Sequence, residues 1–374
     1  MAKKTGGRNN TLTNGLNFRP QAELNKTEKK GTKPLPEPST IPHVLLLLIV
    51  HLCKKVLYVD TNIKVGIYIM FVFFGSILGD VLPIPNTYFS RKGNFFNVYF
   101  VKLSWGWTMA SVGLFVWLTS TVYSCADKIK IRRQMLRLII ATIIWYVCTS
   151  TINIVEESYG YCSKSAHVTK KQCLAKGLSW YGFSISGHAF ILIYCTLIIM
   201  EEAKALIGWE GIKDHLRNEE HNRTAIDAGV QTPLDSLTNE QLTILKEKYE
   251  KYTPYIRLSF ISMTLLTIIW DVMLVATVLY FHSTPEKFAA SVIAVVIWFF
   301  TYRFVYHRRI LGIPLPGEGS FQYMQSAYTG RRSSLILGKN EKIQTFLGMP
   351  LNFPKSPQSV AEQGSAKTSE KASR

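Results

Sequence analysis

The sequence lacks the short motifs that identify several large enzyme classes. It has no Gly-rich phosphate loop and no dinucleotide fingerprint, so it does not indicate a P-loop NTPase or a Rossmann-type dehydrogenase. Its six cysteines are scattered and form no closely spaced pairs, which argues against a zinc site. No internal repeat is visible. We therefore expect neither a metal nor a cofactor.

Acidic residues are also scarce, because 25 Asp and Glu stand against 43 Lys and Arg, a net charge of +18. Such a balance occurs in nucleic-acid-binding proteins, but here the basic residues lie in both ends and in short segments between apolar runs. The positive-inside rule predicts that distribution for a membrane protein. With 47% apolar and 12% aromatic residues, the composition indicates a membrane-embedded chain. We expect no nucleic-acid partner.

The N-terminal forty residues are polar and contain no apolar core followed by a small-residue cleavage site. We therefore expect no cleavable secretory signal, so that the first spanning helix acts as its own anchor. Residues 1–42 are predicted to form a disordered basic tail. Residues 307–374 are predicted to form a second tail, which is polar and poor in aromatic residues after Pro350.

Long apolar runs define the region between the tails. A bilayer core needs about 20 mostly apolar residues per helix, and the candidate spans are 65–82, 98–123, 138–155, 180–200, 258–281 and 288–306. A shorter run within 43–61 is interrupted by His51, Lys54 and Lys55, and predicts an interfacial or half-spanning helix. The predicted fold class is therefore all-α, a polytopic membrane protein with a six-helix core over 62–306.

Loop charge predicts how these spans are oriented. The basic segment 128–137 and the exit at Arg303 should face the cytoplasm, and six spans then keep both tails on that side. The segments 83–97, 156–179 and 282–287 become lumenal, and the loop 201–257 becomes cytoplasmic, with a helix predicted after the cap Thr238. Cys162 and Cys173 share one lumenal loop, where a disulfide can form.

Ionisable residues at span ends are functional candidates, because they are costly to place in a membrane. Asp80, Lys102, His188 and His282 all lie at ends that the predicted topology makes lumenal. Glu286 follows His282 by four residues, one helical turn if the helix continues, and is placed to orient its ring. Four spans should therefore deliver polar groups to one depth.

The segment before His188 contains Ser184, Ser186 and Gly187. Small residues at a helix start leave backbone N–H groups for an anion such as phosphate. His188 is then placed to protonate a leaving oxygen, and His282 to attack the phosphorus.

Each of these side chains also has a simpler interpretation. Either histidine alone is commonly an interfacial residue, and Lys102 either extends its ammonium toward the headgroups or neutralises a phosphate. Asp271 lies about 16 Å from His282 at the helical rise, so we expect it to bond to neighbouring spans or to recognise a lipid headgroup.

Four segments resemble the fat storage-inducing transmembrane protein family: LPIPNTYFSRKGNFFNVYFVKLSWGWT (82–108), IIWYVCTSTIN (143–153), FSISGHAFILIYCTLIIMEE (183–202) and VLYFHSTPEK (278–287). The resemblance covers about 60–306 in order. It implies six spans in the endoplasmic reticulum membrane, cytoplasmic termini, a role in lipid-droplet formation and binding of neutral lipid.

The family is distantly related to type 2 phosphatidic acid phosphatases, in which one motif ends in Ser-Gly-His and another carries a nucleophilic His. By that correspondence His188 matches the first motif and His282 the second. The resemblance implies cleavage of the phosphoanhydride of fatty acyl-CoA, giving acyl 4′-phosphopantetheine and adenosine 3′,5′-bisphosphate. Ala276 stands where those phosphatases carry an Arg, and Lys102 is the candidate substitute.

Two other classes of function are compatible with the sequence. A non-enzymatic protein that binds di- and triacylglycerol and partitions them into droplets would use the lumenal polar groups and Asp271 to hold headgroups. A solute transporter is disfavoured, because paired broken helices and an internal repeat are not visible.

Overall fold

The computed structural model describes residues 41–82, 84–91, 93–163, 169–182, 184–224, 232–323, 345–346 and 349–350. The predicted disorder of the two tails therefore falls mostly outside the described residues. The α-helices are α1 (Ile41–Leu57), α2 (Thr61–Val81), α3 (Ser104–Tyr123), α4 (Lys128–Tyr159), α5 (Lys170–Ala175), α6 (Gly187–Ala203), α7 (Gly211–Thr224), α8 (Asn239–Tyr280) and α9 (Thr284–Trp298).

Shorter elements complete the described chain. There are 3-10 turns at Tyr88–Ser90 and Lys204–Leu206, and π-helical segments at Phe96–Val101 and Phe299–Tyr306. Two antiparallel strand pairs join β1 (Tyr161–Cys162) to β2 (Trp180–Tyr181) and β3 (Thr345–Phe346) to β4 (Met349–Pro350).

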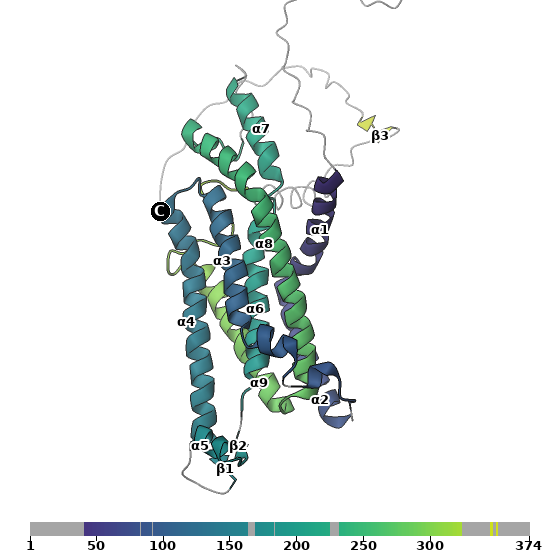
Figure 1. Ribbon diagram of the computed structural model, residues 1–374. Helices are drawn as coiled ribbons and strands as arrows, with labels where there is room; N and C mark the ends of the chain where they lie inside the picture. The colour runs from purple at the N-terminus through teal and green to yellow at the C-terminus, as the bar shows by residue number, and fades with distance from the viewer. Residues whose placement is uncertain are drawn as a thin grey trace, which may run out of the picture.

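Six long helices, α2, α3, α4, α6, α8 and α9, pack side by side in one elongated bundle (Figure 1). The bundle is organised around α6, which contacts α3, α8 and α9 most closely. Every residue of α6 from Ala189 to Ala203 is buried. A helix that is apolar on all sides must be surrounded by other helices, which accounts for the uninterrupted run ILIYCTLIIM.

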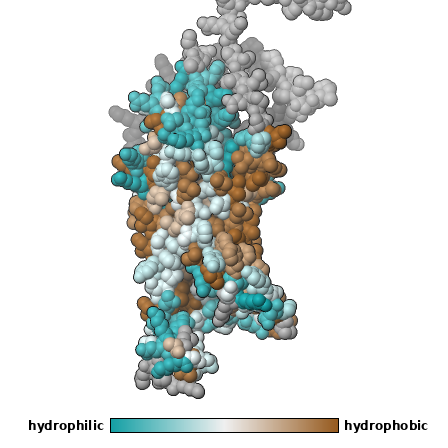
Figure 2. Space-filling view, in the orientation of Figure 1, coloured by the Kyte–Doolittle hydropathy of each residue, from teal (hydrophilic) through white to brown (hydrophobic). Residues whose placement is uncertain are grey.

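Four of the described helices are long and apolar enough to cross a membrane: α2, α4, α8 and the segment Thr284–Tyr306, which joins α9 to the following π-helix. Much of their surface is apolar and exposed. Hydrophobic residues cover the middle of the bundle on the face shown in Figure 2, between hydrophilic ends. The chain is therefore a predominantly helical membrane protein. The other two bundle helices differ from these four. Helix α3 carries several Ser and Thr residues, and α6 is shorter, with only 17 residues.

The segment predicted as interfacial is helix α1. One of its faces, with Val50, Cys53 and Leu57, is buried against the bundle. The opposite face is apolar and exposed, since Leu45 and Leu48 expose 57% and 54% of their surface. A helix that is apolar on both faces requires an apolar environment on its outer side.

The segment 201–257, predicted to join two spans, is largely helical. It contains α7 and the first part of α8, which continues past residue 257 into the predicted span. The N-terminal cap was predicted correctly, because the side chain of Thr238 accepts from the N–H of Gln241 at 3.3 Å, and Gln241 returns the contact in a capping box. The predicted span 258–281 is the second half of this longer helix. Pro254 lies inside α8 without ending it.

A buried ion pair fixes the end of α6 that lies away from the histidines. Nε and Nη2 of Arg137, on α4, donate to the two carboxylate oxygens of Glu202 at 2.8 and 2.7 Å, and both side chains are at most 1% exposed. Tyr302 donates to the same carboxylate at 2.9 Å. Because the charges are matched and bonded, α4, α6 and the last helical segment are held in register.

Candidate active site

The turn between α8 and α9 presents His282. Helix α8 ends at Tyr280, and Pro285 occupies the first turn of α9. The helix therefore does not continue through the turn. His282 adopts the left-handed backbone conformation, with φ of 59°, which is uncommon outside glycine but relatively frequent for His, Asn and Asp. Such conformations often mark functional sites.

Glu286 lies beside the ring of His282. Its Oε2 lies 3.4 Å from Nδ1 of His282 and accepts the N–H of Ser283 at 3.0 Å. Its Oε1 accepts the N–H of Ser184 at 2.8 Å. One carboxylate therefore caps α9, binds the chain before α6 and orients the imidazole. The sequence predicted Glu286 as the partner on the basis of one continuous helix. In the structure Glu286 instead reaches back to His282 from the first turn of the next helix, α9.

His188 lies in the first turn of α6 and is half-buried. Ser186 caps this helix, since its Oγ accepts the N–H of Ala189 at 3.3 Å and its own N–H donates to the carbonyl of Glu286 at 3.3 Å. Glu286 thus joins the start of α6 to the turn that carries His282. The structure brings the predicted residues Ser186, Gly187 and His188 at the start of α6 to the predicted residues His282 and Glu286.

Lys102 follows the π-helix Phe96–Val101 and precedes α3. A π-helical segment rotates the chain relative to an α-helix, so the predicted single span 98–123 is two segments. The ammonium of Lys102 belongs to the turn between them, on the same side of the bundle as the two histidines.

Asp80 was a candidate because it lies at a span end, whereas Lys287 was not assigned to the site by sequence. Asp80 accepts from the hydroxyl of Thr284 at 2.6 Å and lies 3.6 Å from the ammonium of Lys287. Lys287 is 1% exposed and donates to the carbonyl of Val278 at 2.8 Å. Lys287 directly follows Glu286 at the start of α9, so no local pattern marks it. These contacts fix the ends of α2 and α8 against α9.

Gly79 lets α2 approach α8 closely at this point. A Cβ at Gly79 would lie 3.1 Å from the carbonyl oxygen of Leu279. Small residues at such crossings allow two helix backbones to touch. Asp80 therefore reaches the start of α9.

Asp271 lies elsewhere on α8. It pairs with the ammonium of Lys64 at 2.6 Å and accepts the hydroxyl of Tyr68, both on α2. The expectation that Asp271 bonds to a neighbouring span is confirmed, and the structure does not bring it to the histidines.

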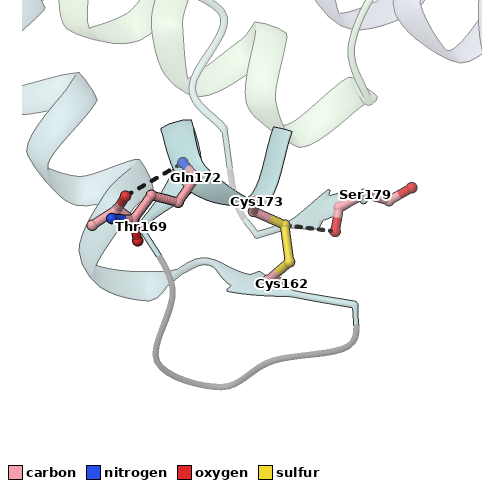
Figure 3. Close-up of a disulfide and its surroundings, with 5 residues drawn as sticks. All are labelled: Cys162, Thr169, Gln172, Cys173 and Ser179. Atoms are coloured by element: carbon pink, nitrogen blue, oxygen red, sulfur yellow. Dashed lines mark hydrogen bonds between the residues drawn. A yellow bond between two sulfur atoms is a disulfide. The ribbon is translucent and has the colours of Figure 1, made fainter. Parts of the chain in front are cut away.

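A small disulfide-linked unit precedes the start of α6. Cys162 and Cys173 are joined by a disulfide, with their Cα atoms 5.9 Å apart, and Figure 3 shows the bond beside the carbonyl of Ser179. Strands β1 and β2 pair within this unit. The unit forms the polar end of the molecule below α4 (Figure 1). Because β2 ends at Tyr181, this unit also anchors the start of the chain segment that carries Ser184 and Ser186.

The arrangement is chemically suited to phosphoryl transfer. A carboxylate-oriented imidazole can act as a nucleophile, and a second imidazole beside it can exchange a proton with a leaving oxygen. Backbone N–H groups at the start of α6 and the ammonium of Lys102 offer positive charge for a phosphate. No group of three or more His, Cys, Asp or Glu side chains arranged to hold a metal occurs among the described residues.

Comparisons with known proteins agree on one family. Residues 85–159 and 153–302 match the fat storage-inducing transmembrane protein family. A relative from Drosophila melanogaster, the acyl-coenzyme A diphosphatase FITM2, is 39% identical and covers 96% of this chain and 92% of its own length. The Homo sapiens protein of that name is 31% identical over 68% of this chain and 86% of its own. No solved structure matches the chain significantly.

Proposed function

This chain belongs to the fat storage-inducing transmembrane protein family, and on that basis we propose that it is an acyl-coenzyme A diphosphatase whose chemistry is carried out by His282 and His188. The substrate is fatty acyl-CoA, whose phosphoanhydride is cleaved to acyl 4′-phosphopantetheine and adenosine 3′,5′-bisphosphate. The observation that carries the assignment of these residues is that Glu286 faces the ring of His282 and also binds the start of the helix that carries His188.

In the first step Nε2 of His282 attacks one phosphorus of the phosphoanhydride, since Nδ1 is the atom that faces Glu286. A nitrogen–phosphorus bond forms while the bond from phosphorus to the bridging oxygen breaks. His188 gives a proton to that departing oxygen. Glu286 stabilises the positive charge that develops on the ring of His282.

In the second step water attacks the phosphorus, and the nitrogen–phosphorus bond breaks. His188, left unprotonated by the first step, accepts the proton of the water. The second phosphate product leaves, and both histidines return to their starting states. Lys102 and the N–H groups at the start of α6 balance the charge of the phosphates in both steps. The uncharged methyl group of Ala276 cannot do so.

We place this chemistry at the lumenal face of the endoplasmic reticulum membrane, with six spans and cytoplasmic termini. The helices α2, α3, α4, α6, α8 and α9 alternate in direction, which supports six crossings. The basic start of α4 and the pair Arg308 and Arg309 lie away from the histidines, as positive-inside topology requires. The disulfide lies at the histidine end, which suits an oxidising lumen.

A role in lipid-droplet formation and neutral-lipid binding is a second candidate function. The ion pair of Asp271 with Lys64 favours it, because both side chains remain partly exposed, at 31% and 18%, on an otherwise apolar part of the bundle. Polar atoms at that depth can bond the free hydroxyl or ester groups of di- and triacylglycerol. The partners in this function are neutral lipids of the same membrane.

The enzymatic assignment is tested by measuring release of adenosine 3′,5′-bisphosphate from oleoyl-CoA by the purified, full-length protein. His282→Ala and His188→Ala should each abolish turnover, whereas His307→Ala, an exposed histidine outside the site, should leave it unchanged. Full turnover by either site variant in folded protein would refute the roles given to the pair.

A further inference from the structure

A large cavity lies at the opposite end of the bundle from the histidines. It has a volume of about 820 Å³ and is lined by residues of α1, α7 and α8, together with Glu210 in the turn before α7. That volume is within the range of cavities that hold small molecules. The three helices that line it are labelled in Figure 1. The proposed diphosphatase chemistry uses none of its lining residues.

One wall of the cavity belongs to the helix that we interpret as interfacial. His43 and Leu46 of α1 line it. The neighbouring residues Leu45 and Leu48 point outward and are more than half exposed, where they require lipid contact. The cavity therefore lies at the level of a membrane surface, and its natural occupant is an amphiphile with a polar head.

The lining carries charges of both signs. Its permanent cations are Lys213, Arg217, Lys246 and Arg257. Its carboxylates are Glu210, Glu220 and Glu250. Arg257 pairs with Glu210 at 2.6 Å and Lys246 with Glu220 at 2.7 Å. A polyanionic ligand would face three carboxylates at close range, whereas a zwitterionic headgroup finds a partner for each of its charges.

Pro254 adds a hydrogen-bond acceptor to this lining. Proline has no N–H, so within α8 it cannot donate to the carbonyl of Glu250, four residues earlier. Both residues line the cavity. The side chain and the carbonyl of Glu250 together suit a ligand with several N–H donors. A primary ammonium has three.

A quaternary ammonium fits this lining less well. It has no N–H to donate, and its recognition depends on several aromatic faces. Tyr249 is the sole aromatic residue among those that line the cavity. The phosphate of the headgroup has its own partner in Arg217, whose guanidinium is 3.9 Å from the mostly exposed carboxylate of Asp214.

We propose that this cavity binds the headgroup of a phospholipid with a primary ammonium, of the phosphatidylethanolamine type. The phosphate lies against Arg217, and the ammonium lies between the carboxylate and the carbonyl of Glu250. The acyl chains extend along the outer face of α1 into the membrane.

The test uses full-length protein in phosphatidylcholine nanodiscs that contain a trace of photo-crosslinkable phosphatidylethanolamine. Labelling should exceed that of the matched phosphatidylcholine probe by about tenfold, which corresponds to about 1.4 kcal/mol, and should map to α1, α7 or α8. Glu250→Gln and Arg217→Glu should each lower labelling by about tenfold. Glu247→Gln, a neighbouring exposed carboxylate paired with Lys248, should leave it unchanged.

Three results would overturn the proposal. They are equal labelling by the choline and ethanolamine probes, labelling that survives Glu250→Gln, and competition by oleoyl-CoA or a phosphatidylinositol phosphate as strong as that by phosphatidylethanolamine. Retained diphosphatase turnover by Glu250→Gln shows that the variant is folded. That readout separates a failure at this cavity from a failure of the histidine mechanism.

Discussion

Replacing Glu286 by Gln tests whether the carboxylate that orients His282 contributes to turnover. Glu286 accepts the N–H groups of Ser184 and Ser283 and faces Nδ1 of His282. A glutamine has one carbonyl oxygen, so its NH₂ group must face either the donor at Ser184 or the donors at Ser283 and His282. One charge-assisted hydrogen bond is lost in either case, and such bonds contribute about 1.5–3 kcal/mol.

That loss falls on the transition state, because the ring of His282 becomes positive only as it attacks. We therefore expect kcat to fall about 10- to 100-fold, with KM changing less than threefold. The assay is release of adenosine 3′,5′-bisphosphate from oleoyl-CoA, together with the single-turnover rate of phosphoenzyme formation. Glu286→Asp keeps the charge and should recover part of the rate, which a purely structural role would not predict.

A matched control exists at the other end of the bundle. Glu318 also accepts a backbone N–H, that of Leu315 at 3.1 Å, and pairs with Arg309. Glu318→Gln should leave kcat unchanged. The reasoning fails if Glu286→Gln retains kcat within twofold of the parent, or if its loss of rate is fully explained by loss of folded protein.

Three further predictions concern the surroundings of the histidines. Lys102→Ala should raise KM for acyl-CoA about tenfold, with Lys102→Arg close to the parent, and steady-state kinetics at two ionic strengths will detect it. Gly79→Leu should lower thermal stability and turnover together, since its Cβ would lie 3.1 Å from the carbonyl of Leu279; Gly66→Leu, with open space around it, is the control for a thermal-shift assay. Breaking the disulfide with Cys162→Ser and Cys173→Ser should cost the disulfide-linked unit about 2–3 kcal/mol, seen as faster proteolysis between β1 and β2.

The sequence predicted the approximate positions of the bundle helices, because long apolar runs leave few alternatives in a membrane. It predicted the start of α8 after Thr238, but not that this helix continues through Pro254 into the span. Proline usually ends a helix, so the exposed Pro254 inside α8 runs against the local sequence pattern. The polar composition of 201–257 was consistent with a loop, yet Leu242 and Leu245 are buried against the bundle.

Part of the candidate site was also predicted from the sequence, because its residues stand out against the apolar spans. Histidines and carboxylates at span ends are rare enough to be conspicuous, so His188, His282 and Glu286 were identifiable. Lys287 was not, because it follows Glu286 directly and the pair resembles an ordinary charged turn. Its burial depends on Asp80, more than 200 residues away, and a contact at that separation has no local signature in the sequence.

The length of α6 has a consequence for the depth at which His188 lies. Its 17 residues span about 25 Å at 1.5 Å per residue, which is shorter than the roughly 30 Å hydrocarbon core of an average bilayer. The helices that face the lipid are longer, since α2 has 21 residues and Thr284–Tyr306 has 23, so the buried α6 does not set the thickness of the surrounding bilayer. His188, at the first turn of α6, should instead lie below the headgroup level, within the depth that these outer helices span.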